Sequence, residues 1–541
     1  MSKTPKLWLW LSIVIALLMT TPIWVLVSFV FTPGNENWQH LLNTLLPEYV
    51  LNSIWLMLGV GFGTLLLGVS TAWLVTHYRF YGSRWLHWAL LLPLAMPAYI
   101  SAYTYTGLLE FEGPVQTAFR ELTGQTTLGW FPEIRSIGGA ILLFSLVLYP
   151  YVYLLSRSAF SASGHHALEV SRTLGVGPWK RFFYIALPMA RPAIIAGVTL
   201  ALMETLADFG AVQHFGVDTF TTGIYRTWSG LGDTHTAAQL SLVLLAFVAL
   251  LIGVERWTRK QQRYFEQSTP STETELTQLK GVRGWSLFAI CFLPLLLGFL
   301  VPSAQLFYWS FTTADTQWNR EFFELAWNSF SLALISALVV VGLAVILAYA
   351  KRLSRQKSVS RLVTVTHLGY AVPGTVLAIA VLIPLAWLDK VIDDFAYNHY
   401  EVSTGLIFSG TLFALVLAYS VRFMSVALQS VEAGLQRIKP NMDDSARTLG
   451  LASGTILRKV HLPLLQTSLL TALILVFVEV LKELPTTLIL RPFNFDTLSI
   501  RAYEMAADER LADAGLPALL IVLTGLIPVI LLSQLMDKKR A

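Results

Sequence analysis

The sequence of 541 residues contains little charge and a single cysteine. Charged residues make up 13% of the chain and hydrophobic residues 55%, whereas soluble globular proteins carry about 25% charged residues. This composition cannot supply a solvated surface around one soluble core, so it predicts an integral membrane protein. The lone Cys291, inside an apolar run, excludes an intrachain disulfide and any cysteine-based zinc or iron–sulfur site.

The chain also lacks the common motifs of nucleotide binding and hydrolysis. No G-x-x-x-x-G-K-[ST], H-E-x-x-H or G-x-S-x-G segment occurs. The ten histidines are scattered, and the adjacent pair His165–His166 is typical of a solvated helix start rather than a metal site. We therefore expect this chain to be neither an enzyme nor the holder of ATP, another cofactor or a metal. The net charge of +5 is not gathered in a patch, so no nucleic-acid partner is expected.

Long apolar runs recur throughout the chain, and each is long enough to span a bilayer as a helix. They predict an all-α polytopic membrane protein of about twelve transmembrane helices. The first run, which ends before Thr32-Pro33-Gly34, is too long for a signal peptide and is expected to be retained. The twelve predicted spans are 7–31, 52–77, 86–109, 138–156, 191–213, 236–256, 285–311, 328–350, 362–387, 404–425, 465–490 and 515–536.

The distribution of basic residues predicts the orientation of these spans. With the N-terminus inside, all but nine of the 38 Lys and Arg residues fall in cytoplasmic segments, including those of 422–459. The segment 389–400, rich in Asp and Asn, falls in an outer loop. The positive-inside rule then places both termini in the cytoplasm, as expected for a multi-pass protein of a bacterial inner membrane. The nine exceptions are Arg120, Arg135, Arg226, Arg320, Lys390, Lys482, Arg491, Arg501 and Arg510.

Four consecutive letters occur twice, as Arg172-Thr173-Leu174-Gly175 and as Arg447-Thr448-Leu449-Gly450. The offset of 275 residues is about half the chain, which indicates a duplication. Six spans in each half predict two parallel repeats related by an axis along the membrane normal. The predicted organisation is a first half at 1–256 (core about 50–255), a cytoplasmic linker at 257–284, and a second half at 285–541 (core about 328–535).

The surroundings of the repeat share a spacing. An acidic residue, Glu169 or Asp444, lies six positions before the glycine, and a Leu-Pro pair lies twelve and thirteen positions after it. The pattern predicts a short helix with the acidic residue in its first turn, a glycine that ends it, a second basic helix, and a proline that opens the next span. A generic interfacial helix–turn is the alternative, but it does not explain two matched copies.

This spacing resembles the EAA loop of the type I permeases of ABC importers. In that family the loop forms a coupling helix that sits in a cleft of the ATPase subunit. The resemblance implies two copies of a cytoplasmic ATPase, a periplasmic solute-binding protein and a lipid environment. Val170-Ser171 depart from the two alanines that the family favours, and Asp444 replaces Glu. The implied coupling residues are Glu169, Arg172, Gly175, Leu187, Pro188, Asp444, Arg447, Gly450, Leu462 and Pro463.

Three further stretches, 203–212, 220–225 and 479–487, look like the fused ferric-iron permeases of this family. The resemblance implies import of ferric iron by alternating access. Permeases for thiamine, phosphonate or polyamine share the architecture and stay open as alternatives. A secondary transporter, driven by an ion gradient without an ATPase, also fits twelve spans but leaves the duplicated spacing unexplained.

Ionisable residues within the spans are the candidates for a translocation path, because charges in a bilayer are costly and usually have a use. Carboxylate and phenol oxygens suit a hard cation such as Fe(III). The alternative is that these acids pair with each other or with Arg226 and Arg491 and only hold the halves together. The candidates, spaced four apart in pairs, are Glu204 and Asp208, Glu479 and Glu483 (with Lys482 as a partner), and Tyr99 and Tyr103. No tight metal site is expected among them, since conduction requires weak contacts.

Overall fold

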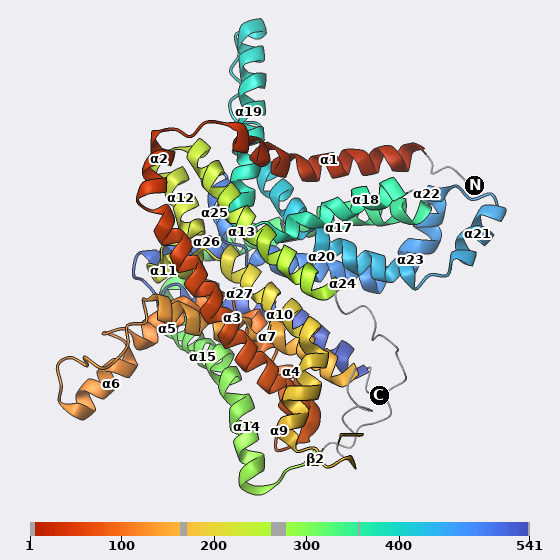
Figure 1. Ribbon diagram of the computed structural model, residues 1–541. Helices are drawn as coiled ribbons and strands as arrows, with labels where there is room; N and C mark the ends of the chain where they lie inside the picture. Colours follow the sequence, from red (N-terminus) through yellow and green to blue (C-terminus); the bar gives the residue numbers. More distant parts are fainter. Residues whose placement is uncertain (1–5, 163–169, 172, 261–276, 355–356, 539–541) are drawn as a thin grey trace. The chain divides into compact units, whose positions relative to one another are not determined.

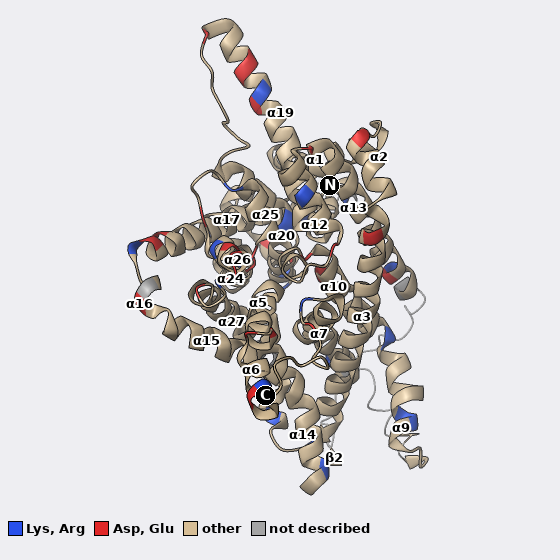
Figure 2. Ribbon diagram, turned by 90° about the vertical axis from the view of Figure 1, so that its left-hand side faces the viewer, with Lys and Arg blue, Asp and Glu red and all other residues tan. Residues whose placement is uncertain are grey.

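The computed structural model of the protein describes residues 6–162, 170–171, 173–260, 277–354 and 357–538 (Figure 1). Within these ranges nine helices are long and apolar enough to cross a membrane, and eleven spans result if two bent helix pairs each count as one. Gly515–Leu531 is a shorter apolar helix. Every predicted run therefore contains an apolar helix, which confirms the all-α polytopic fold, and the described residues give nine to eleven candidate spans where twelve were predicted. Charged residues are sparse along the ribbon (Figure 2).

The first compact unit consists of residues 1–38, 224–245 and 318–501. Three long helices, α17, α20 and α24, pack against one another, and α1 packs along α17, α18 and α19 (Figure 1). The helices of this unit are α1 (Lys6–Ser28), η1 (Phe29–Phe31), α17 (Arg320–Leu353), α18 (Lys357–Thr366), η5 (His367–Ala371), α19 (Gly374–Tyr400), α20 (Leu412–Gln436), α21 (Pro440–Thr448), α22 (Ser453–Ile456), η6 (Leu457–His461), α23 (Leu462–Leu464), α24 (Gln466–Leu481) and α25 (Pro485–Leu490).

The second compact unit consists of residues 39–223, 246–317 and 502–541. Helices α3, α7 and α10 pack together in it as α17, α20 and α24 do in the first unit, while α27 packs on α15. The parallel pair β1 (Tyr78–Arg79) and β2 (Thr277–Gln278) also lies here. The helices are α3 (Leu46–His77), α4 (Ser83–Ala89), η2 (Leu92–Ala95), α5 (Ala98–Leu109), α6 (Pro114–Thr123), α7 (Ile137–Ala162), α9 (Pro178–Arg181), η3 (Phe182–Ala186), α10 (Leu187–Ala207), α11 (Gly210–His214), α14 (Gly281–Leu295), η4 (Leu296–Leu300), α15 (Val301–Thr312), α16 (Ala314–Gln317) and α27 (Gly515–Lys538).

The compact units differ from the predicted sequence halves. Helix α1, from the first half, packs on the core of the second half, and α14, α15 and α27, from the second half, pack in the unit built on α3, α7 and α10. Four helices run through a unit boundary along the chain, namely α2 (Glu36–Asn43), α12 (Phe220–Leu231), α13 (Thr234–Lys260) and α26 (Leu498–Ala507). The duplicated segments thus supply the cores, while the flanking helices are exchanged between the halves.

The segment 389–400, predicted to be part of an outer loop, is helical instead, because α19 continues to Tyr400. Its predicted external location stays a prediction. Two aspartates in the C-terminal half of α19 hold the returning chain against it. The Asp389 carboxylate accepts hydrogen bonds from the backbone N–H groups of Phe408 (2.9 Å) and Ser409 (2.8 Å). Asp393 accepts one from Thr404 (2.7 Å). The polar residues that suggested a loop therefore stabilise a helix and its return.

Candidate functional site

The repeated letters form the same turn in both copies, which we call the first repeat segment (170–188) and the second repeat segment (440–463). Gly175 has φ +74° and Gly450 has φ +79°, in the left-handed region that glycine adopts without strain. The residue after each glycine donates its N–H back five positions, at 3.0 Å in the first segment and 3.2 Å in the second. This is the Schellman cap that ends a helix. The predicted helix stop at each glycine is confirmed.

Each Leu-Pro pair follows a turn of π-helix. The two π-helical turns, Phe182–Ala186 and Leu457–His461, are offset by the same 275 residues as the repeat. Proline lacks an N–H and its ring clashes with the carbonyl four residues earlier, so the wider turn accommodates Pro188 and Pro463. Pro188 lies in the first turn of α10, as predicted, although the helical chain continues without a break over Pro178–Ala207. After Pro463 the chain instead bends by 78° between α23 and α24.

The two repeat segments present one common and several different side chains. Leu174 and Leu449, each beside its glycine, are 75% and 78% exposed. The first segment adds exposed aromatic rings at Trp179 and Tyr184. Lys459 holds the position in the second segment that corresponds to Tyr184. An exposed leucine side chain beside a glycine turn is therefore the shared feature that a single kind of partner could recognise.

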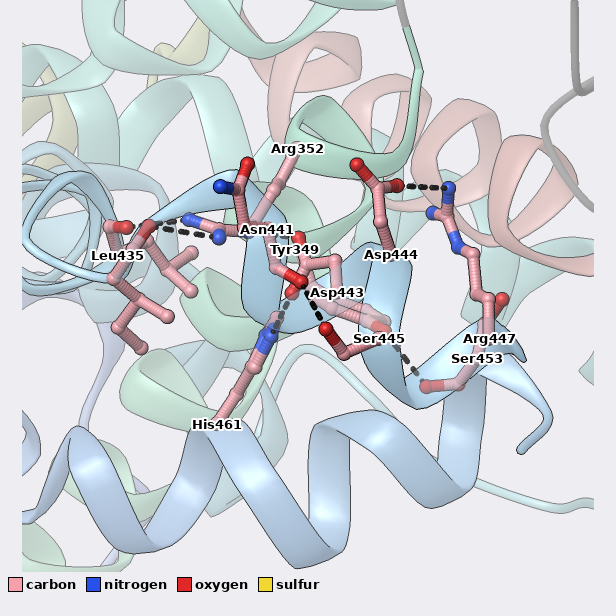
Figure 3. Close-up of polar contacts among 11 residues, drawn as sticks. Tyr349, Arg352, Leu435, Asn441, Asp443, Asp444, Ser445, Arg447, Ser453 and His461 are labelled. Carbon is pink, nitrogen blue, oxygen red and sulfur yellow. Dashed lines mark hydrogen bonds and ion pairs between the residues drawn. The ribbon is translucent and has the colours of Figure 1, made fainter. Parts of the chain in front are cut away.

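Only the second segment has a described ion-pair anchor, which ties α21 to α17 (Figure 3). The Asp443 carboxylate accepts hydrogen bonds from Arg352 Nε (2.8 Å) and from His461 Nε2 (2.5 Å). Arg352 also donates to the carbonyl of Ile438 (2.9 Å), and the Tyr349 hydroxyl donates to the carbonyl of Ser453 (2.7 Å). Burial opposes ionisation of Asp443, but the hydrogen bonds from Arg352 and His461 outweigh it and hold the pKa of the carboxyl below its usual value.

The sequence selected the wrong aspartate for the first turn of this helix. Helix α21 begins at Pro440, so Asp443 lies in the first turn, and Asp444 lies beyond it. The Asp444 side chain is 73% exposed and lies 3.9 Å from Arg447. The sequence spacing of six residues before Gly450 selects Asp444. The adjacent pair Asp443-Asp444 was the signal that a second acid, Asp443, faces inward. Of the first copy, Glu169 and Arg172 lie outside the described residues.

The spans that follow both repeat segments break at an acidic residue. Helix α10 ends at Ala207, and the Asp208 carboxylate then accepts the N–H of Ala211 (2.9 Å) at the start of α11. Glu483 does the same for Thr486 (3.2 Å) at the start of α25. Their carbonyls also match, since Asp208 accepts from the Thr221 hydroxyl (2.6 Å) and Glu483 from the Ser499 hydroxyl (3.0 Å). Each carboxylate caps a short helix in its own unit.

The buried Glu483 is paired with a residue that the sequence placed elsewhere. Arg422 lies 3.4 Å from Glu483, and both side chains are largely buried. The sequence assigned Arg422 to a cytoplasmic segment, but it lies in the middle of α20. Lys482 pairs with Glu479 at 2.8 Å, as expected, and Arg491 pairs with Asp496. Glu479 and Glu483 are thus ion-paired, with Lys482 and Arg422 respectively. The path-lining role of the six candidates stays a prediction for Glu204, Asp208, Glu479, Glu483, Tyr99 and Tyr103.

A comparison with protein families decides the class of the protein. The model of the family "Binding-protein-dependent transport system inner membrane component" matches residues 1–263 and 340–541. The chain belongs to this family. The prediction of an importer permease is thereby confirmed at the level of the family, and the protein is a multi-pass transport subunit.

The chain is also similar in sequence to individual transport permeases. The chain is 27% identical over 543 residues to the Fe(3+)-transport system permease protein FbpB 2 of Haemophilus influenzae, with 99% of each chain covered. It is 22% identical to the putative ferric transport system permease protein FbpB 1 of the same organism, over 87% of this chain and 75% of that protein. The molybdenum transport system permease protein ModB of Escherichia coli is 27% identical, over 36% of this chain and 86% of its own.

The permease has little room around the Glu483–Arg422 pair, which leads to a stability prediction. A Cβ at Gly374, the first residue of α19, would lie 2.4 Å from Arg422 Nη1 and 2.6 Å from Glu483 Oε1. We expect Gly374→Ala to lower the free energy of unfolding by about 1–3 kcal/mol, as overpacking of a dense site does. Thermal unfolding in detergent measures the change.

The matched control is Gly342→Ala in α17, where no atom lies within 4 Å of an added Cβ. That variant should be neutral or more stable, because alanine favours a helix interior over glycine by about 1 kcal/mol. Equal unfolding midpoints for the two variants would contradict the tight fit at Gly374.

Proposed function

We propose that this permease forms the membrane channel of an ABC importer for ferric iron, with both halves of the channel in one chain. The observation that carries the coupling role is the duplicated glycine turn with its exposed Leu174 and Leu449. Two identical turns suit two copies of the same ATPase subunit. ATP would be bound and hydrolysed there, since this chain has no phosphate-binding motif. The charge bias supports cytoplasmic termini and a periplasmic binding protein on the opposite face.

The proposed cycle is alternating access. Closure of the ATPase dimer moves the two repeat segments, and the spans that follow them reorient around the path. The resident coupling residues are those of the repeat segments, with Gly175 and Gly450 setting the turns, Leu187-Pro188 and Leu462-Pro463 following the π-helical turns, and Arg447 with Asp444 on the exposed side. Ferric iron as the solute is supported by the likeness to two ferric permeases over most of the chain.

Transport in proteoliposomes tests this proposal. The permease is reconstituted with the ATPase and the binding protein of its own system, and the binding protein is loaded with radioactive Fe(III). We expect accumulation that requires ATP hydrolysis, fails with a non-hydrolysable ATP analogue, and survives ionophores that collapse ion gradients. Uptake that stops with the ionophore would instead indicate a secondary transporter.

The solute is tested separately on the binding protein. We expect it to bind Fe(III) and not thiamine, a phosphonate or a polyamine, as judged by titration calorimetry of the purified protein. Tight binding of one of these other solutes would overturn iron while leaving the ATP-driven permease intact.

A further inference from the structure

A buried tyrosine hydroxyl in the second unit makes no hydrogen bond. Tyr103, in α5, is 1% exposed, and its hydroxyl oxygen has no hydrogen-bond partner among the described residues. Its ring packs edge-on against His214 (centroids 4.8 Å apart) and lies 5.7 Å from the ring of Tyr99. Burying a hydroxyl without a partner destabilises a fold, so such a group calls for a use.

Other oxygen-bearing side chains act electrostatically on this hydroxyl. Tyr103 interacts electrostatically with Tyr99, Tyr503 and Asp208. The ring of Tyr503, on α26, lies 5.8 Å from that of Phe209, the residue after Asp208 at the break between α10 and α11. Tyr103 therefore has two phenols and one carboxylate within electrostatic range, from α5, α26 and the broken span, all within one compact unit.

The remaining polar neighbour is already engaged. His214 Nε2 lies 3.0 Å from the Thr106 hydroxyl, so this nitrogen is held by α5 itself. The other polar groups that act on Tyr103 carry oxygen, and one of them, the Asp208 carboxylate, also caps α11. Hard cations of high charge prefer oxygen ligands.

The second repeat does not reproduce this cluster. The positions 276 residues after Tyr99 and Tyr103 are Thr375 and Ile379, which carry no phenol. The helix-capping carboxylates are shared by the two repeats, whereas the α5 phenols Tyr99 and Tyr103 occur in the first repeat alone and Tyr503 comes from the second half of the sequence. The cluster is therefore not required by the repeated fold.

We propose that Tyr103, with Tyr99, Tyr503 and Asp208, forms a transient binding site for the ferric cargo on its way through the permease. This inference rests on the proposed transport of iron. The oxygens replace part of the hydration shell of the cation, and a phenol that binds through its oxygen loses its proton to water and regains it on release. The cation keeps the rest of its hydration shell, so it can leave the contact again, as conduction requires.

The test compares Tyr103→Phe with Tyr149→Phe. Tyr149, on α7, is also fully buried and its hydroxyl also lacks a hydrogen bond, so it loses the same group outside the cluster. We expect Tyr103→Phe to slow radioactive Fe(III) uptake roughly tenfold, as the loss of one contact to a charged group does. Its unfolding midpoint should stay the same or rise, and ATP hydrolysis stimulated by the loaded binding protein should persist. Tyr149→Phe should transport normally.

Two results would overturn the site. Normal iron uptake by Tyr103→Phe would show that the hydroxyl does not contact the cargo, while leaving iron transport by the wild type untouched. Slower uptake together with a lower unfolding midpoint would show a structural role. Absence of Fe(III) uptake by the wild-type permease would instead refute the proposed function on which the site rests.

Discussion

The Gly450→Asp variant should reach the membrane in normal amount and take up no solute above background. Gly450 has φ +79°, and no atom lies within 4 Å of a Cβ built on it. The change therefore causes no clash inside the permease, and aspartate tolerates the left-handed conformation better than most residues. Its charge would instead enter the proposed contact with the ATPase. An unpaired carboxylate in a closed interface costs several kcal/mol, or at least about two orders of magnitude in binding.

The controls separate charge, strain and position. Gly124→Asp makes the same change at a glycine with φ +66° and open surroundings, at the end of α6 on the side predicted to be external. It should transport normally. Gly450→Asn keeps the shape without the charge and should retain much of the activity. Vesicle uptake and co-purification of the ATPase provide the measurements, and full uptake by Gly450→Asp would remove the coupling role from this turn.

Local chemistry made the repeated turn predictable from the sequence. A glycine after a run of helix-forming residues, with Leu-Pro at a fixed distance, specifies a helix stop and a restart through backbone geometry alone. Both Schellman turns at Gly175 and Gly450 were therefore correctly predicted. The π-helical turns before Pro188 and Pro463 were not, because nothing in the composition distinguishes them from α-helix.

Predictions that depended on tertiary partners were less successful. Arg422 interrupts an apolar run, so hydropathy assigns it to a span end, and only its pairing with Glu483 allows it to lie within α20. The acidic residues of 389–400 suggested a loop, yet they bind the returning chain and extend α19. Helix α1, from the first half of the sequence, packs on helices of the second half. The hydrophobic periodicity of the sequence does not indicate this contact.

The same dependence on tertiary partners explains why the sequence did not identify Asp443, whose replacement should have the second large effect. Asp443→Ala should destabilise the permease and impair uptake together. The Asp443 and Arg352 side chains are 14% and 15% exposed, and removal of one partner leaves the other charge poorly solvated. Breaking a fully buried pair costs about 3–5 kcal/mol, so this partly solvated pair should cost up to about 3 kcal/mol. The anchor between α21 and α17 is lost, and motion of the second repeat segment no longer reaches the span.

The neighbouring Asp444→Ala is the matched control, because it removes the same group from a site that is 73% exposed. It should leave the unfolding midpoint unchanged, since exposed pairs contribute about 0–1 kcal/mol. The difference in unfolding midpoint between the two variants should be fully present near pH 7. The pKa of Asp443 is lowered by folding, so its stabilisation exists above the unfolded pKa of about 3.9 and disappears as the pH falls through the folded value. Equal unfolding midpoints of the two variants at pH 7 would show that Asp443 does not anchor the segment. Both aspartates would then be assigned to the contact with the ATPase.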